Sequence, residues 1–316
     1  MTLVTGGTGF IGSRITRSLL QRGEGVVCFD ARPDVARLGD AAPHRLLRLV
    51  EGDIVDLESL RAAIQQHAVR RIIHTAAVLT GPCETDPGLG VRVNVVGTTN
   101  VFEAARAGGV ERVVYASSLV VHGNQWDHEG RTLTESAPLV PHTFYADTKV
   151  MNERTADAYT KAFGLDCRGL RIGAPFGPGG QTGRPGAEVT RLCALAAVGT
   201  PITIQLGRAE SPPSTYVDDI AEIFIRLSAA PRPNLRHSVY VCSVATVAIE
   251  DVARMVQTLL PRTEIAFADQ GAKVTLPYRI DAGRLEADID YRLPPLQARL
   301  RDHINAVRRL NGLPEA

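Results

Sequence analysis

The chain has 316 residues, well above the roughly 150 typical of one domain, so one large or two medium domains are expected. Its 35 Lys and Arg residues balance 34 Asp and Glu residues. That balance argues against nucleic-acid or polybasic membrane-surface binding, since both depend on a concentrated positive field. No stretch of about 18 apolar residues indicates a membrane span.

Five cysteines lie far apart, at positions 28, 83, 167, 193 and 242. Without a Cys-x-x-Cys pair they predict neither a disulfide framework nor a zinc site, and they are typical of a reducing compartment. The first residues also lack the basic and apolar regions of a signal peptide. We therefore expect a cytoplasmic globular enzyme that holds no metal.

Short apolar runs alternate with helical patterns along the first half of the chain. The apolar residues of each run are contiguous, as in strands covered on both faces. Ile11, Ile15 and Leu19 recur at helical spacing, and another helical segment follows Asp56, a candidate N-cap. Such repeated units predict right-handed crossovers and a doubly wound parallel α/β sheet, the Rossmann arrangement. The predicted strands are residues 1–5, 25–30, 44–50, 69–76, 111–117 and 166–172.

The texture of the sequence changes near Gly173, where a Gly- and Pro-rich segment predicts a long loop. We therefore divide the chain into a Rossmann domain, residues 1–172, and a smaller mixed region, residues 173–316, that mainly binds substrate. A strand over 238–243 is expected to return to the main sheet. The other elements predicted after the loop are a helix over 188–198, a strand over 202–206, and helices over 218–228, 249–260 and 296–310.

Three glycines spaced three apart, Gly6, Gly9 and Gly12, follow the first predicted strand and precede a helix. Such a turn suits a dinucleotide diphosphate, because it brings backbone N–H groups and the positive end of the helix dipole to the phosphates. The Gly-Lys-Ser/Thr ending of a P-loop is missing, which argues against a nucleoside triphosphatase. A glycine cluster alone is also compatible with a tight turn that binds nothing.

Asp30 ends the second predicted strand, close to the ~20-residue offset at which an acidic side chain accepts hydrogen bonds from the adenosine ribose. Its charge would repel a 2′-phosphate, which favours NAD over NADP. Arg32 argues in the other direction, because an arginine at this position could bind the 2′-phosphate of NADP. Asp53 and Ile54 follow the third strand and suit a contact with the adenine edge.

Ser118 stands at the carboxyl end of the fifth predicted strand, directly after Ser117. Tyr145 and Lys149 stand one helical turn apart further along the chain. A phenol, with a pKa near ~10, is a poor base at neutral pH unless a neighbouring cation stabilises the phenolate. With Lys149 beside it, Tyr145 could exchange the hydroxyl proton of a substrate while hydride moves to or from a nicotinamide. Ser118 would hydrogen-bond the same substrate oxygen. A lone Tyr-x-x-x-Lys is common by chance, but here it follows a dinucleotide turn.

The motifs taken together resemble those of the extended short-chain dehydrogenase/reductases of the NAD-dependent epimerase/dehydratase family. They are TGGTGFIG, HTAA, VNVVGTTN, ASSLVVHG, YADTK with Glu153, RIGAPFGPG and YVDDIA, which span nearly the whole chain. The resemblance implies that Ser118, Tyr145 and Lys149 are catalytic, and that Asn94 is a structural asparagine. It implies cofactor contacts from Gly6, Gly9, Phe10, Ile11, Asp30, Asp53, Ile54, Ala76, Tyr145, Lys149 and Pro175.

The resemblance also implies a homodimer, formed through helices within residues 93–106 and 145–159. It places Thr80, in the loop after HTAA, and Ser118 and Tyr145 against the substrate. His122 stands where the family often has tyrosine, and it could polarise a substrate hydroxyl or carboxylate or simply be a histidine at a strand end.

Three departures from the family pattern bear on the reaction. Leu119 and Val120 replace the Asp-Glu pair of the sugar dehydratases, and neither can transfer a proton. Ala174 replaces an asparagine common in nucleotide-sugar epimerases. Pro212, Pro213 and Ser214 stand where an arginine often clamps the nucleotide diphosphate, a loss of roughly 1.5–3 kcal/mol for each charged hydrogen bond. The arginines that could compensate are Arg184, Arg191 and Arg208.

These patterns predict an NAD-dependent dehydrogenase that acts on a secondary alcohol or ketone of a sugar-like or hydroxy-acid substrate. The alternative is a nucleotide-sugar 4-epimerase that uses the same three residues but returns the hydride to the opposite face. A non-catalytic NAD-binding regulator is a third reading. Such a regulator typically loses the tyrosine or the lysine, whereas this chain keeps both.

Overall fold

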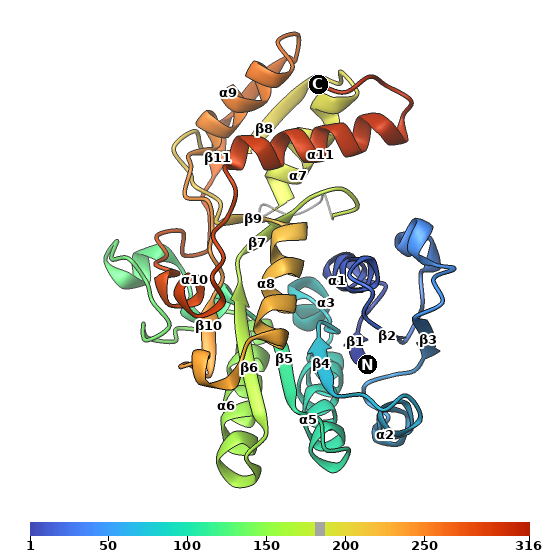
Figure 1. The fold of residues 1–316 in the computed structure, drawn as a ribbon. Helices are drawn as coiled ribbons and strands as arrows, with labels where there is room; N and C mark the ends of the chain where they lie inside the picture. The colour runs from blue at the N-terminus through green and yellow to red at the C-terminus, as the bar shows by residue number, and fades with distance from the viewer. Residues whose placement is uncertain (181–186) are drawn as a thin grey trace.

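A seven-stranded sheet forms the centre of the molecule, in a computed structural model that describes residues 1–180 and 187–316 (Figure 1). All of its strands are parallel, in the order β10-β6-β5-β4-β1-β2-β3. The strands are β1 (Thr2–Thr5), β2 (Val26–Asp30), β3 (Leu47–Glu51), β4 (Arg71–His74), β5 (Arg112–Ser118), β6 (Asp166–Ile172) and β10 (Val239–Val241).

The strand order reverses beside β1, which pairs with β2 on one side and β4 on the other. Ligands of open parallel sheets bind at this switch point, outside the carboxyl ends of the strands. The register places Thr5 beside His74 and His74 beside Tyr115. The segments that leave β1, β4 and β5 therefore emerge at the same edge of the sheet.

Helices cover both faces of the sheet (Figure 1). On one face, α1 (Phe10–Gln21) and α8 (Val217–Ala229) bury Ile15, Leu19 and Phe224 against the strands. On the other face, α2 (Leu57–Gln66), α5 (Thr98–Ala107) and α6 (Phe144–Phe163) bury Leu60, Ile64 and Val101. This confirms the doubly wound α/β arrangement predicted from the contiguous strand runs.

The helix ends follow local side-chain chemistry. Asp56 caps α2 as predicted, with its side chain accepting hydrogen bonds from the N–H groups of Glu58 and Ser59. Thr143 caps α6 in the same way through the N–H of Ala146, at 3.1 Å. Gly164 ends α6 in the left-handed conformation. Both ends of the helix that carries Tyr145 and Lys149 are thus defined by the sequence.

Short segments join these elements. Three are 3₁₀ turns: η1 (Val35–Ala41), η3 (Leu119–His122) and η4 (Gln125–His128). The chain after β4 forms α3 (Thr80–Thr85), α4 (Pro87–Gly90) and a π-helical turn, η2 (Val91–Gly97). A further 3₁₀ turn, η6 (Arg232–Asn234), precedes β10.

The residues after β6 build a separate hydrophobic core, whose buried members include Leu192, Ile204, Val256 and Ile304. β10 and α8 instead join the main sheet, so this region is divided between two cores. Its remaining elements are β7 (Ala174–Phe176), α7 (Glu188–Ala197), β8 (Ile202–Leu206), β9 (Ser214–Tyr216), α9 (Ile249–Leu259), β11 (Ile265–Ala272), α10 (Gly283–Ile289) and α11 (Leu296–Leu310). β7 pairs with β9, and β8 pairs with β11.

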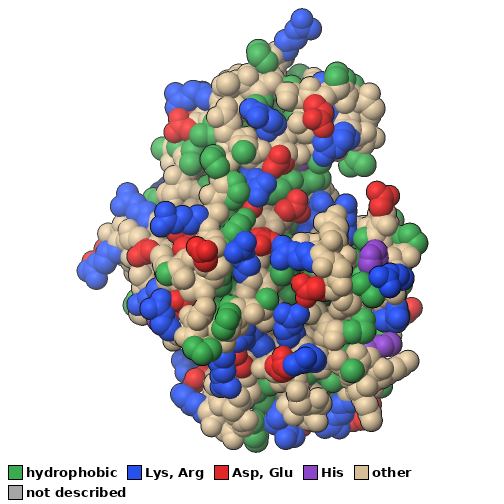
Figure 2. Space-filling model, viewed as in Figure 1, with side chains coloured by type: hydrophobic (Ala, Val, Ile, Leu, Met, Phe, Trp, Pro, Cys, Tyr) green, Lys and Arg blue, Asp and Glu red, His purple; other side chains and the backbone are tan. Residues whose placement is uncertain are grey.

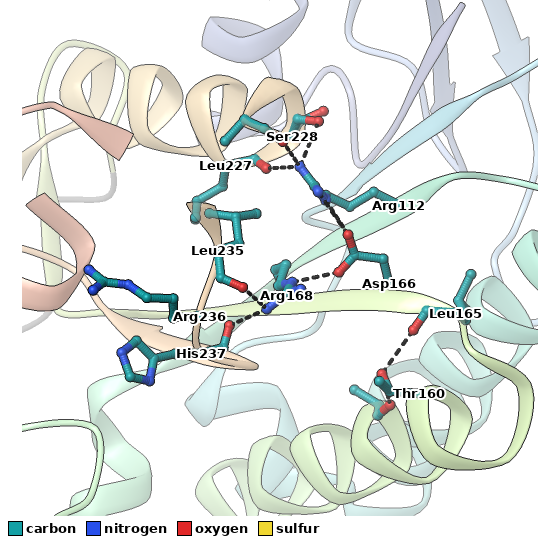
Figure 3. A network of polar contacts seen from close by, with 12 residues as sticks. Arg112, Thr160, Leu165, Asp166, Arg168, Leu227, Ser228, Leu235, Arg236 and His237 are labelled. Carbon is teal, nitrogen blue, oxygen red and sulfur yellow. Dashed lines mark hydrogen bonds and ion pairs between the residues drawn. The ribbon is translucent and has the colours of Figure 1, made fainter. Parts of the chain in front are cut away.

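A buried ionic network ties β5 and β6 to α8 at the amino edge of the sheet (Figure 3). Asp166 accepts hydrogen bonds from Arg112, at 2.8 Å, and from Arg168, at 2.5 Å. Arg112 also donates to the carbonyl oxygens of Leu227 and Ala230, at 2.9 and 2.6 Å. A cation there offsets the negative end of the α8 dipole. The network fixes the ends of both strands far from the carboxyl edge.

Charged side chains of both signs are interspersed over the face of the molecule shown in Figure 2. This matches the near-neutral formal charge of +1. Within the described parts of the chain, no helix combines the length and the apolar character that crossing a bilayer requires.

Candidate active site

The glycines of the turn between β1 and α1 leave little room for a Cβ. Gly6 has a φ of 63°, and a Cβ there would lie 2.9 Å from the backbone nitrogen of Ala76. A Cβ on Gly12 would lie 2.0 Å from the carbonyl oxygen of Gly6, and one on Gly9 would lie 3.0 Å from it. The backbone is therefore packed against itself and against the end of β4, where Ala76 follows.

The N-terminus of α1 is open to an anion. Gly9 is the N-cap residue, no side chain caps the helix, and its first turn holds no acidic residue. The leading N–H groups of a helix lack intrahelical acceptors and favour a phosphate. Phe10 and Ile11, at the start of α1, are half-buried. Together with the crowded glycine turn, this end of α1 fits a dinucleotide diphosphate.

Asp30 is held against the glycine turn. One oxygen of its carboxylate accepts hydrogen bonds from the N–H and the hydroxyl of Thr8, at 3.0 and 2.7 Å. The other accepts from the N–H of Arg32, at 3.1 Å. Spacing alone had not singled out Thr8, although its hydroxyl within TGGTG was a signal. Arg32 itself is exposed, beside a carboxylate whose orientation is fixed.

Asp53 and Ile54 follow β3 at the same edge. Asp53 is exposed and accepts a hydrogen bond from the N–H of Val55, at 2.9 Å. The side chain of Ile54 is buried under Gly97, where a Cβ would lie 2.6 Å from its Cδ1. A contact of Ile54 with an adenine ring would therefore come from its backbone. Both contacts stay predictions.

Lys149 lies under Tyr145 at the start of α6. Its Nζ is 5.5 Å from the centre of the Tyr145 ring and donates to the carbonyl oxygen of Ala116, at 2.9 Å. Both side chains are buried. Burial lowers the pKa of Lys149 to about 8, against the opposing influence of Cys83 and Glu153. The lysine thus keeps most of its ammonium charge at neutral pH, where that charge can stabilise a phenolate.

Ser118 is the last residue of β5, two positions after the carbonyl that Lys149 contacts. Its hydroxyl oxygen lies 3.5 Å from the carbonyl oxygen of Ile172 and 3.4 Å from the N–H of Val120. Both contacts are long, and the residue is half-buried. β5 and α6 therefore bring the three candidate catalytic residues to the edge where the glycine turn lies.

Asn94 connects the loop after β4 to α6. Its side chain exchanges two hydrogen bonds with the backbone of Val78, at 2.9 and 3.0 Å. It also donates to the hydroxyl of Thr148, at 3.2 Å. Asn94 thus has the structural contacts that the resemblance implied. Thr80, a candidate substrate contact, begins α3 two residues after Val78 and is half-buried.

The structure does not support His122 as a substrate contact. Its side chain is 0% exposed in η3. Nδ1 donates to the carbonyl oxygen of Pro138, at 3.0 Å, and Nε2 accepts from Arg171, at 2.9 Å. Burial, with the charge of Arg171, lowers the pKa of His122 to about 4, so the ring is neutral. Both ring nitrogens are occupied within the protein, and the ring plays a structural role instead.

The β7–β9 ladder holds Ala174 and Ser214, two of the positions at which the chain departs from the family pattern that it resembles. Ala174 pairs with Ser214, and both residues are buried. Pro175, the predicted nicotinamide neighbour, is half-buried on β7. Arg191 forms an ion pair with a glutamate of α7, and Arg208 with one of α9. Arg184 lies outside the described residues.

A cavity of about 770 Å³ lies at the opposite edge, by the amino ends of β1, β4, β5 and β6. Charged side chains that line it pair with one another, among them Arg71 with Glu24 and Arg112 with Asp166. The candidate active site is therefore defined by the side chains gathered at the carboxyl edge and not by this cavity.

Comparison with known proteins identifies the family. A family model described as "NAD dependent epimerase/dehydratase family" matches residues 2–243. The chain belongs to this family. It is an NAD-dependent enzyme of the extended short-chain dehydrogenase/reductase type, and its cofactor is NAD. The family, the enzyme class and the cofactor predicted from the sequence are thereby confirmed.

The relatives include epimerases and dehydrogenases. The UDP-glucose 4-epimerase of Mycolicibacterium smegmatis is 31% identical over 229 residues, 71% of this chain and 72% of that protein. The D-erythronate dehydrogenase of Cupriavidus necator is 34% identical over 179 residues, 54% of this chain and 53% of that protein. Among solved structures, the Thermus thermophilus UDP-glucose 4-epimerase in complex with NAD has a TM-score of 0.80 and 25% identity, over 97% of this chain and 98% of that one.

Proposed function

We propose that the enzyme is an NAD-dependent dehydrogenase that acts on a secondary alcohol or ketone of a sugar-like or hydroxy-acid substrate. The observation that carries this choice is the β7–β9 ladder, where Ala174 and Ser214 are small and buried. Neither can replace a charged bidentate clamp on a nucleotide diphosphate. Arg191 and Arg208 are already paired with glutamates. A substrate without a nucleotide suits this lining better.

Ser118, Tyr145 and Lys149 handle the proton in this proposal. When bound, NAD supplies the nicotinamide ring that accepts or donates the hydride. Tyr145 takes the proton from the substrate hydroxyl, or returns it to the ketone in the reverse direction. The ammonium of Lys149, 5.5 Å from the centre of the Tyr145 ring, stabilises the phenolate. Ser118 donates a hydrogen bond to the same substrate oxygen, and Thr80 contributes to substrate binding.

The test is the fate of the hydride. Purified enzyme is mixed with NAD and, separately, with uronic acids, aldonates and nucleotide sugars, and NADH is followed by its absorbance. A dehydrogenase accumulates NADH in proportion to substrate consumed. If nucleotide sugars are interconverted while NADH stays constant, the dehydrogenase proposal is wrong.

The second candidate is a nucleotide-sugar 4-epimerase. It is favoured by one observation, the 31% identity to the Mycolicibacterium smegmatis UDP-glucose 4-epimerase over most of both chains. The same three residues would serve it, since both reactions begin with oxidation of a hydroxyl. A non-catalytic NAD-binding regulator is disfavoured, because Tyr145 and Lys149 are both present and packed together.

A homodimer and a cytoplasmic location complete the proposal. Val96, Met151 and Phe163 are large apolar side chains that stay exposed on η2 and α6. Val96 and Met151 lie in the two segments through which the resemblance implies a dimer, and a second copy would cover them. Sedimentation equilibrium measures whether the enzyme dimerises. All five cysteines are free and buried, which agrees with a reducing compartment. Fractionation of the source cells tests the location.

Asp30→Ala is expected to narrow the preference for NAD over NADP. The substitution removes a fixed negative charge that would lie beside a 2′-phosphate. The measurement is kcat/KM with each cofactor. Asp34→Ala is the matched control, because Asp34 is an exposed carboxylate of the same loop that already pairs with Arg37. If the unmodified enzyme prefers NADP, Arg32 dominates the choice and Asp30 does not.

Activity is expected to fall as pH rises through about 8, the pKa to which burial lowers Lys149. Below that pH the lysine is charged and stabilises the phenolate of Tyr145; above it the charge is lost. kcat/KM measured across this range should therefore show a high-pH limb. Lys149→Arg keeps its charge at these pH values, so any residual activity should lack that limb. The same limb in Lys149→Arg would assign it to another group.

A further inference from the structure

A buried polar network lies directly behind the candidate catalytic residues, and the proposed proton transfer does not use it. Glu153 and Arg171 form a two-pronged ion pair, with N–O distances of 2.8 and 2.7 Å. Glu153 also accepts a hydrogen bond from the hydroxyl of Ser117, at 2.6 Å. Both charged side chains are more than nine-tenths buried. Burying an ion pair is costly, so its place in the fold calls for a physical reason.

The network holds the two elements that carry catalysis. Glu153 stands one turn after Lys149 on α6. Ser117 lies on β5 between Ala116, whose carbonyl oxygen accepts from Lys149, and Ser118. A single carboxylate therefore joins the helix of the lysine to the strand segment that holds both its acceptor and the catalytic serine.

Arg171 extends this link to the segments that follow Ser118. It donates to the ring of His122 and to the carbonyl oxygen of Glu135, each at 2.9 Å. Arg171 thus links its own strand, β6, to α6 through Glu153, to η3 through His122 and to the loop that contains Glu135. Its partners stand far apart in sequence, and only the packing of these elements brings them together.

Glu153 also supplies the negative charge that favours the ammonium of Lys149. The other titratable groups that face Lys149 are Tyr145 on α6, His74 on β4 and Cys83 on α3. Burial lowers the pKa of His74 to about 3, so its ring is neutral. Burial raises the pKa of the Cys83 thiol, which stays protonated at neutral pH. Among the described groups that face Lys149, Glu153 is the one held in an ion pair, with Arg171.

We propose that Glu153 and Arg171 are positioning residues for catalysis. Their ion pair holds the helix that carries Tyr145 and Lys149 against the strand segment that carries Ser118. The proposal rests on the proposed role of these three residues in proton transfer. The buried ion pair would then position catalytic residues in addition to stabilising the fold. A second buried ion pair, distant from the site, allows the positioning role to be distinguished from fold stabilisation.

The test compares Glu153→Gln with Asp166→Asn. Asp166 on β6 forms a buried ion pair with Arg112 on β5, at the opposite edge of the sheet (Figure 3). The first readout is the titration of Lys149 followed by NMR of the lysine side-chain methylene groups. The chain has three lysines, so Lys161 and Lys273 serve as internal references. This readout needs no substrate, so it stands even if the proposed function fails.

In Glu153→Gln the midpoint of the Lys149 titration is expected to move to lower pH, with the other two lysines unchanged. Turnover should fall by about 10–100-fold, as for small misplacements of reacting groups, with NAD affinity retained. Asp166→Asn should lose stability without moving the Lys149 titration. An unmoved Lys149 titration in Glu153→Gln, or an equal shift in Asp166→Asn, overturns the proposal.

Ser117→Ala keeps the test decisive if Glu153→Gln fails to fold, because it removes one hydrogen bond and leaves the ion pair paired. We expect a smaller but measurable loss of turnover with unchanged NAD affinity. Where no substrate has been found, the Lys149 titration is expected to shift in this variant too. Full turnover in Ser117→Ala overturns the proposal. If no substrate is known, an unchanged Lys149 titration in this variant overturns it.

Discussion

Replacing Tyr145 with phenylalanine is expected to cut turnover by about 10²–10⁴-fold, the usual contribution of a positioned general acid or base. The substitution removes only the hydroxyl, so the ring should stay packed over Lys149 and cofactor affinity should change little. Steady-state kcat and the dissociation constant for NAD measure the two effects separately.

Tyr159→Phe is the control for this prediction. Tyr159 lies on the same helix, and its hydroxyl donates to Glu103, at 3.3 Å, away from the sheet edge that carries the site. Its loss should leave turnover unchanged. Comparable turnover of Tyr145→Phe and the unmodified enzyme would remove Tyr145 from the mechanism.

Gly12→Ala is expected to abolish NAD binding and to destabilise the fold by about 1–3 kcal/mol, the range for overpacking. The added Cβ would lie 2.0 Å from the carbonyl oxygen of Gly6 and 3.0 Å from the Cα of Gly7. These are backbone atoms, so relief requires α1 to move away from β1. Such a movement displaces the helix N-terminus that is offered to the diphosphate. Denaturant unfolding and NAD titration measure the two losses.

Gly207→Ala is the matched control, because the atom nearest to its new Cβ is Cγ of Glu210 at 3.4 Å, an ordinary contact. It should change neither stability nor NAD binding appreciably. Tight NAD binding by Gly12→Ala would show that the turn can open without harming the site, and would refute our account of the three glycines.

Local sequence patterns predicted the main sheet and its helices. The predicted strand over 166–172 matches β6. The predicted helix over 296–310 matches α11, because an amphipathic period over about four turns is a strong signal. β7 and β9 were not predicted. Each has three residues, too few to show a period, and each exists only because it pairs with the other.

Residues close in sequence were also the ones whose roles could be anticipated. The crowded turn at Gly12 and the capping of α2 by Asp56 follow from short-range geometry, and the structure shows both. His122 shows the limit of this reasoning. Its position in the motif suggested a substrate contact, but its surroundings come from β6 and a distant loop, which enclose both ring nitrogens.

By itself, the sequence determined the family, the cofactor, the doubly wound sheet and the candidate catalytic residues Ser118, Tyr145 and Lys149. Each of these was read from short motifs or from strand and helix patterns, in which nearby residues determine the local backbone geometry. Only the tertiary structure decided what surrounds these catalytic residues, including the enclosure of His122 and the pairing of Glu153 with Arg171. A buried charge takes whichever partner the packing of separate elements supplies, and no local pattern of residues specifies that choice.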